Sequence, residues 1–238
     1  MKLITNGITY DTTVMFLPKN SVYMKDISFH TFLEDSEVNN LHLLSIYSCA
    51  FHHSRENFTI NVWIMITNKH TDSLRKAFEH YTNIKLRIFN QEIMNTIKDT
   101  ILYDYGGCWF EPTVVFLKTI EALFWTYGKH VCTFQTGTTM NVNPNIMISM
   151  SAKDPVLKDF LCSHDKEVIM FPSSWIDPLS VSNPFTNVND YHQLCKKDTH
   201  FNFYSYSVCC KACEGTEMEE GSTLKGVWDK VAPQTSTK

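Results

Sequence analysis

Oxygen-bearing side chains follow a double glycine near the middle of the sequence. Glu111 and Thr113 come directly after a short apolar segment that itself follows Gly106 and Gly107. A carboxylate and a hydroxyl at the end of a strand are hard oxygen ligands, which Mg²⁺ and Mn²⁺ prefer when they also bind phosphate oxygens. The pattern therefore suggests a site in which a divalent cation stabilises charge on a departing nucleoside diphosphate. A capped helix followed by a strand with one incidental acidic residue explains the same residues without a site.

Two neighbouring features add candidates and keep alternatives open. Trp109 lies within the same apolar segment, where its ring could stack on a base or a sugar, although a Trp after Gly-Gly is also typical of a core. The polar segment from Gln135 to Asn145 follows an expected strand and is rich in hydrogen-bonding side chains, including Asn141 and Asn143. Turn-forming asparagines explain such a loop equally well.

The elements that must position these residues follow from the spacing of the apolar side chains. Strand-like and helix-like patterns alternate from Ile27 to about Leu123, which predicts an α/β fold with helices packed on a mostly parallel sheet. Ligands of such sheets bind at the carboxyl ends of the strands, so the residues that follow strands are the candidates for function. The expected strands are 27–32, 60–67, 84–88, 108–110, 114–117, 131–134 and 145–150, and the expected helices are 38–49, 72–81, 93–105 and 119–127.

Individual residues mark the ends and faces of several helices. Ser45 and Ser48 give the first helix a contact face of small residues, and Asp72 is placed to cap the second. Asp154-Pro155 predicts the start of a further helix. The chain becomes polar and irregular after Pro172, and a last helix is expected at 224–231. We expect residues 1–24 to be an N-terminal extension and residues 25–238 to form a single domain.

Composition excludes several classes of protein. The 238 residues are 43% hydrophobic, which is too apolar for a disordered chain. The formal net charge is −4, so no basic excess exists to neutralise phosphates, and nucleic acid is not an expected partner. The longest uninterrupted apolar run, Val62 to Ile66, is far shorter than the roughly 20 residues of a membrane span, and no targeting segment is visible.

The sequence contains eight cysteines, and two kinds of chemistry are possible for them. Four of them lie near the end of the chain, and Cys210 and Cys213 have the only Cys-x-x-Cys spacing. A zinc site formed by residues of the C-terminal group, Cys195, Cys209, Cys210 and Cys213, together with His192 or His200, is one possibility. Buried thiols with one or two disulfides are the other.

The segment around the double glycine resembles a sequence pattern of the Golgi α-1,4-glycosyltransferases, the family of lactosylceramide galactosyltransferase and the related N-acetylglucosaminyltransferases. That pattern reads Leu-Tyr-Lys-Tyr-Gly-Gly-x-Tyr-Leu-Asp-x-Asp-Val-x-x-Leu-Lys, and weaker similarity extends over 45–62 and 222–235. The resemblance implies a GT-A-like fold, a UDP-sugar donor, a Mn²⁺ or Mg²⁺ cofactor, retention of anomeric configuration and a glycan or glycolipid acceptor. It also implies the Golgi lumen, with membrane association only through an N-terminal anchor that this sequence does not show. The matching residues are Tyr103, Tyr105, Gly106, Gly107, Val114, Leu117 and Lys118.

Carried over by position, the resemblance assigns roles within the candidate site. Glu111 and Thr113 would bind the metal, Asn95 and Lys98 would lie on the nucleotide side, and Asn145 would lie near the donor sugar. Gly106, Gly107 and Trp109 complete the expected donor site. The family's Asp-x-Asp is Glu-Pro-Thr here, so one carboxylate is lost, and the matching aspartate on the preceding helix is Asn95. Because cation affinity depends on ligand charge, these losses favour an alternative, a catalytically inactive relative that keeps the fold.

Overall fold

The computed structural model describes residues 2–5, 8–11, 26–34, 38–67, 69–93, 96–126, 131–134, 145–149, 151–158, 168–171, 193–197 and 205–233. The strands are β1 Lys2–Thr5, β2 Ile8–Asp11, β3 Ile27–Leu33, β4 Phe58–Met65, β5 Ile84–Phe89, β6 Gly107–Phe110, β7 Val114–Phe116, β8 Val131–Phe134, β9 Ile146–Ser149, β10 Val168–Phe171 and β11 Ser207–Cys209. The helices are α1 Asn40–His52, α2 Thr71–Phe78, α3 Ile97–Tyr105, α4 Glu121–Thr126, α5 Pro155–Lys158 and α7 Thr223–Val231, with a 3₁₀ turn η4 at Lys211–Cys213.

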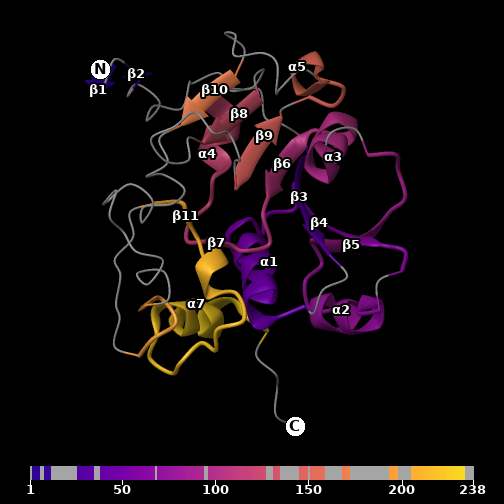
Figure 1. Ribbon diagram of the computed structural model, residues 1–238, viewed down its shortest axis with the longest axis vertical. Helices are drawn as coiled ribbons and strands as arrows, with labels where there is room; N and C mark the ends of the chain where they lie inside the picture. The colour runs from indigo at the N-terminus through magenta and orange to yellow at the C-terminus, as the bar shows by residue number, and fades with distance from the viewer. Residues whose placement is uncertain are drawn as a thin grey trace.

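A seven-stranded sheet in the order β10-β8-β9-β6-β3-β4-β5 forms the centre of the molecule (Figure 1). Four neighbouring strands, β6, β3, β4 and β5, are mutually parallel, and β10 is parallel to β8. The exception is β9, which runs antiparallel to both β6 and β8. The expected fold class, α/β with a mostly parallel sheet flanked by helices, is therefore confirmed. Two further strand pairs, β1-β2 and β7-β11, are antiparallel and form separate small sheets.

Alternation along the strands divides the core between the two faces of the large sheet. Phe29 of β3 and Ile60 of β4 belong to a large apolar cluster that also contains side chains of α1, α2, α4 and α7. Phe32 of β3 and Trp63 of β4 belong to a smaller cluster with side chains of α3 and α5. Both β3 and β4 are therefore buried on both faces.

The small-residue face of α1 packs on β7, as expected from Ser45 and Ser48. Ser45 Oγ donates to the Val114 carbonyl at 2.6 Å, and Ser48 Oγ accepts from the Phe116 amide at 2.9 Å. Since β11 pairs with the opposite edge of β7, the two serines provide hydrogen bonds that a second neighbouring strand would otherwise supply. Helix α1 thereby fixes the strand that directly follows Glu111 and Thr113.

Two expected helix starts differ from the structure. Helix α2 follows His70, and Asp72 lies in its first turn as an exposed ion-pair partner of Arg75, so Asp72 is not the cap. Helix α3 begins at Ile97 because the Thr96 hydroxyl caps it, accepting from the Asp99 amide at 3.0 Å. Ile93, expected on the apolar face of this helix, precedes it and is 54% exposed.

The C-terminal part is more regular than the sequence suggested, although much of 172–204 lies outside the described residues. Strand β11 pairs with β7, and α7 confirms the expected last helix. The Tyr81 hydroxyl donates to the Val231 carbonyl, and the rings of Tyr47 and Trp228 lie 5.9 Å apart, so α7 packs against α1. In the part of the chain that the structure describes, no helix is long and apolar enough to cross a bilayer.

Candidate functional site

The double glycine joins α3 to β6 where the backbone makes very close contacts. Gly106 ends α3 with a φ of 66°, and its amide donates to the Leu102 carbonyl at 2.8 Å. Gly107 has a φ of 88°, and a β-carbon there would lie 2.2 Å from the Ser28 carbonyl oxygen of β3. Both positions therefore require glycine for backbone packing alone. Their expected role toward a donor stays a prediction.

Beyond β6, the chain makes a tight turn that carries the candidate acidic residue. The Val114 amide donates to the Glu111 carbonyl at 2.9 Å, which closes a turn with Pro112 at its second position. Proline fits that position because its φ is fixed near the required value. Thr113 is buried, and its carbonyl accepts from the Cys210 amide at 2.8 Å. The turn redirects the chain from the large sheet into β7.

Two neighbours hold Glu111 in place. Trp109 Nε1 donates to Glu111 Oε1 at 3.0 Å, and the Glu111 amide donates to the Asn145 carbonyl at 2.9 Å. The Glu111 side chain is half-buried. Since β6 and β9 are antiparallel, the end of β6 and the start of β9 lie at the same edge of the sheet. The structure thus brings together Glu111 and Asn145, which the sequence had proposed for one site.

Trp109 contributes to this arrangement in a way that the sequence did not predict. Its side chain is only 4% exposed and packs with Met147 and Leu157 in the smaller apolar cluster. Such burial leaves no ring face for a base or a sugar, so the expected stacking role is not supported. Trp109 instead orients the carboxylate of Glu111 through the indole N–H. A charge-assisted hydrogen bond of this kind restricts the position of a side chain.

The nucleotide-side candidates are only partly described. Asn95 lies outside the described residues, as do Asn141 and Asn143 of the polar loop. Lys98 is the second residue of α3 and is half-buried. Because α3 connects the parallel strands β5 and β6, it must run back from their carboxyl edge to their amino edge. The start of α3, with Lys98, therefore lies toward the same sheet edge as Glu111.

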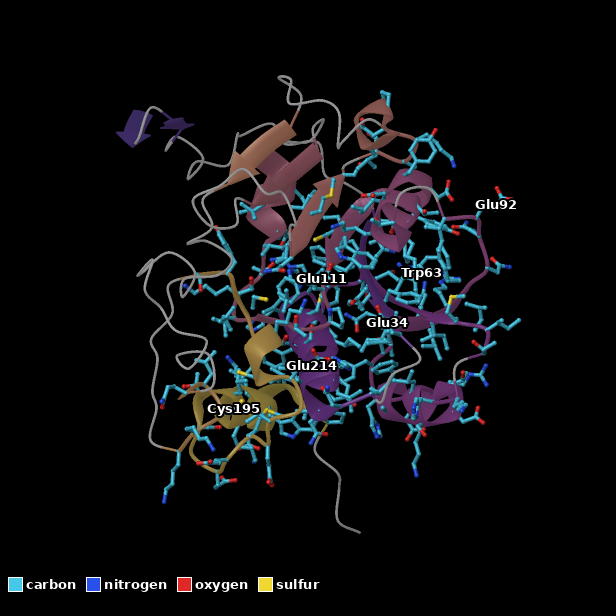
Figure 2. The ribbon with its side chains drawn as sticks, viewed as in Figure 1. Glu34, Trp63, Glu92, Glu111, Cys195 and Glu214 are labelled. Carbon is cyan, nitrogen blue, oxygen red and sulfur yellow. The ribbon has the colours of Figure 1, made fainter. Side chains whose placement is uncertain are left out.

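A second carboxylate at this edge, Glu34, was missed by the sequence reasoning. Glu34 directly follows β3, which pairs with β6 in parallel. Phe32 and Trp109 face the α3 side of the sheet, and continued alternation places Glu34 and Glu111 on that same side. Figure 2 labels both glutamates. Glu34 is exposed. The rule that selected residues 111–113, a polar side chain after a parallel strand, could also have identified Glu34.

The imidazole of His30 is buried next to the double glycine. His30 Nδ1 accepts from Trp63 Nε1 at 3.1 Å, which places the imidazole proton on Nε2, next to the Gly106 backbone. Burial lowers the pKa of His30 to about 3, the nearby backbone of Gly106 opposes this change, and Arg87 adds to it. The neutral ring therefore serves structure and carries no charge into the site.

The metal-binding role expected of Glu111 and Thr113 stays a prediction. Glu111 offers a carboxylate and Thr113 a hydroxyl, and Glu34 offers a second carboxylate on the same side of the sheet as Glu111. Mg²⁺ in phosphate-binding sites is often held by one or two carboxylates together with the phosphates themselves. Among the described residues, no group of three or more His, Cys, Asp or Glu side chains is arranged to hold a metal ion.

Comparisons with known proteins give similarities only at the level of structure. No protein-family model matches the chain, and no curated protein matches it. It is similar to the glycosyltransferase PaToxG (10% identity, 57% of this chain and 58% of that one, TM-score 0.45) and to GlyE of Streptococcus pneumoniae (8% identity, 90% and 66%, TM-score 0.46). It is also similar to the galactosyltransferase LgtC in complex with donor and acceptor sugar analogues (9% identity, 87% and 98%, TM-score 0.48).

The chain covers only part of some of these solved structures. The chain spans 58% of the length of PaToxG and 24% of that of the bifunctional glycosyltransferase WbbM. These four solved structures are glycosyltransferases.

Proposed function

We propose that this chain binds a UDP-sugar at the carboxyl edge of β6 and transfers its glycosyl group to a hydroxyl of a glycan or glycolipid. The observation that carries the proposal is the carboxylate of Glu111, held by Trp109 at 3.0 Å directly after the parallel strand that follows the double glycine. In α/β sheets, the groups that bind ligands lie at the carboxyl ends of the strands. A carboxylate fixed at that position could bind a cation that also binds the phosphates of the ligand.

The proposed roles follow from position. Glu111 and Thr113 would hold a Mn²⁺ or Mg²⁺ ion, and Glu34 would add a second carboxylate on the same side. Bound there, the ion would stabilise the negative charge of the departing UDP. Lys98 at the start of α3 would offset phosphate charge, and Asn145 would lie near the sugar. Asn95 keeps its predicted role on the nucleotide side.

The transfer itself exchanges one bond for another at the anomeric carbon. The bond from that carbon to the UDP oxygen breaks, a bond to the acceptor oxygen forms, and the acceptor proton leaves to a base or to water. Retention of configuration, the α-1,4 linkage, the Golgi lumen and an N-terminal anchor belong to the proposal through the sequence resemblance alone.

Calorimetry with UDP tests the proposal. We expect UDP to bind, and Mn²⁺ to tighten that binding, in the wild-type chain. Glu111→Ala should remove the effect of Mn²⁺, because the carboxylate that faces the ion is lost. Glu56→Ala is a matched control, since Glu56 is an exposed residue before β4, at the opposite edge of the sheet. Absence of UDP binding with or without Mn²⁺ would contradict a donor site.

A second candidate, an inactive relative that retains donor binding, is favoured by the chemistry of the turn. Glu-Pro-Thr supplies one carboxylate, and Pro112 fixes the backbone at the position between the two ligands. A donor-hydrolysis assay separates the two candidates. An active transferase hydrolyses its donor slowly in the absence of an acceptor, and Thr113→Asp should raise that rate if the missing charge is the defect. UDP binding without hydrolysis in either chain would support the inactive relative.

A further inference from the structure

The last strand of the large sheet, β5, has one edge that pairs with no other strand in the described part of the chain. The sheet order ends with β5, which pairs in parallel with β4 along its whole length (Figure 1). Helix α2 packs on one face of β5, since Leu74 and Phe78 belong to the same apolar cluster as Ile84. The helix therefore covers a face of the strand and leaves its outer edge open.

The hydrogen-bonding pattern fixes which backbone groups of β5 point away from β4. The Ile60 amide donates to the Asn83 carbonyl at 2.8 Å, where the parallel ladder begins. Alternate residues of a strand direct their backbone groups to the same side, so Leu86 and Ile88 direct theirs outward. Within the described residues, neither of the two has a hydrogen-bonding partner outside the sheet. Leu86 and Ile88 thus present the donors and acceptors that an added strand would use.

The side chains of β5 give its two faces different characters. Arg87 is the register partner of Trp63, whose side chain lies on the α3 face, and Lys85 shares that face by alternation. Both cationic residues are exposed. Arg87 Nε donates to Asn61 Oδ1 at 3.1 Å, and Asn61 is only 5% exposed, so the guanidinium is held from its inner side. On the opposite face, Ile88 is 41% exposed.

The charges on this edge determine what kind of strand fits it. Among the described residues, the ion pairs of lysine and arginine are made at other positions, so Lys85 and Arg87 have no acidic partner. A second copy paired through its own β5 would bring two lysines and two arginines onto one face of a strand pair. Like charges in that arrangement are unfavourable. The edge therefore fits a strand with carboxylates at alternate positions.

We propose that the outer edge of β5 binds an extended acidic segment of another protein as an added strand. The backbone of that segment pairs with Leu86 and Ile88, and its carboxylates lie beside Lys85 and Arg87. Main-chain hydrogen bonds supply affinity in this mode of binding, and alternate side chains supply specificity. The inference does not depend on the proposed glycosyl transfer, because β3 and β4 separate β5 from β6.

Fluorescence anisotropy with the full chain and a labelled peptide of alternating glutamate and valine tests the proposal. All glutamates of such a peptide lie on one face when it is extended. We expect saturable binding that weakens at high salt, because salt screens charges at the surface. A peptide of alternating threonine and valine keeps the strand propensity without the charge, and it should bind roughly tenfold more weakly. Equal binding of the two peptides, or no binding of the glutamate peptide, would overturn the proposal.

A proline variant separates strand addition from simple charge attraction. The Ile88 amide points away from β4, and edge strands tolerate proline where the N–H faces solvent. Ile88→Pro should therefore keep the fold and weaken binding of the glutamate peptide by roughly tenfold, because an outward donor is lost. Ile88→Ala is the matched control, since it shortens the exposed side chain and keeps the amide. Undiminished binding by a folded Ile88→Pro chain would show that charge alone holds the peptide, which contradicts strand addition.

Charge reversal keeps the proposal testable even if the proline variant fails to fold. The double variant Lys85→Glu, Arg87→Glu changes two exposed residues and should bind a peptide of alternating lysine and valine in place of the glutamate peptide. Continued binding of the glutamate peptide by this variant would contradict the assigned edge. Analytical ultracentrifugation tests the other occupant. A dimer of the wild type that Ile88→Pro abolishes would assign the edge to a second copy and overturn the proposal.

Discussion

Replacing Gly107 with alanine should be far more destabilising than the same substitution at Gly215 or Gly226. The added β-carbon would lie 2.2 Å from the Ser28 carbonyl oxygen, well inside any real contact distance. The obstacle is backbone of β3, the neighbouring strand, so no side-chain rotation relieves it. The φ of 88° adds strain for any residue with a β-carbon.

The magnitude follows from these two terms. A left-handed backbone conformation costs an L-residue about 1–2 kcal/mol, and overpacking a rigid contact costs about 1–3 kcal/mol or more. The expected loss in the free energy of unfolding is therefore about 2–5 kcal/mol, a large part of the roughly 5–15 kcal/mol typical of a folded domain. The Gly107→Ala chain should be marginally folded or unfolded at 25 °C.

Two other glycines serve as matched controls. Gly215 also has a positive φ, 74°, but a β-carbon there meets no atom within 4 Å. Gly215→Ala should therefore lower the free energy of unfolding only by the cost of a left-handed backbone conformation, about 1–2 kcal/mol. Gly226 lies inside α7 with open space around it, so Gly226→Ala should stabilise the chain by roughly 0.5–1 kcal/mol.

Urea unfolding of the four chains, followed by tryptophan fluorescence, measures the series. The order of midpoints should be Gly226→Ala, wild type, Gly215→Ala and then Gly107→Ala. If Gly107→Ala and Gly215→Ala unfold at the same urea concentration, the close approach of β6 to β3 is not present in solution, and the explanation of the double glycine is wrong.

The remaining predictions concern pH and the contact between α1 and β7. Burial lowers the pKa of His30 to about 3 and that of His53 to about 4, from an ordinary 6.5. The unfolded chain then binds protons that the folded chain does not, so stability should fall as pH drops from about 6.5 to 4 by about 1.4 kcal/mol per unit for each histidine. Urea midpoints between pH 7 and 4 check this, and a midpoint independent of pH would refute it. Ser48→Ala leaves the buried Phe116 amide without its acceptor and should cost about 1–3 kcal/mol, whereas the exposed Ser54→Ala should change the unfolding free energy by less than about 0.5 kcal/mol. Equal midpoints for these two variants would contradict the assigned contact.

The parallel part of the fold was predictable because local spacing encodes it. Residues 27–33, 58–65 and 84–89 show the expected strand patterns, and the helices between them force a parallel arrangement. The position of β9 was not predictable, since a four-residue apolar strand carries no information about its partner or its direction. The same limit applies to β11, whose pairing with β7 depends on a contact far away in sequence.

The sequence could predict that Glu111 and Asn145 lie close together, whereas the contacts that support them could not be predicted. The rule that functional residues follow parallel strands selected Glu111, and antiparallel pairing of β6 with β9 explains why Asn145 lies at the same edge. The hydrogen bond from Trp109 depends on burial of the indole in a nonlocal cluster, which sequence spacing does not reveal. Glu34 was missed although the same rule applies to it.

Titration of Mn²⁺ followed by electron paramagnetic resonance tests the central claim, that Glu111 faces a cation-dependent donor site, most directly. With UDP present, the wild-type chain should remove more of the free Mn²⁺ signal than UDP does alone. Glu111→Gln keeps the size of the side chain but removes its charge. With this variant and UDP, the free Mn²⁺ signal should fall no further than it does with UDP alone. Equal depletion by the two chains would show that the ion does not bind at Glu111, and no depletion by the wild type would show that no such site exists.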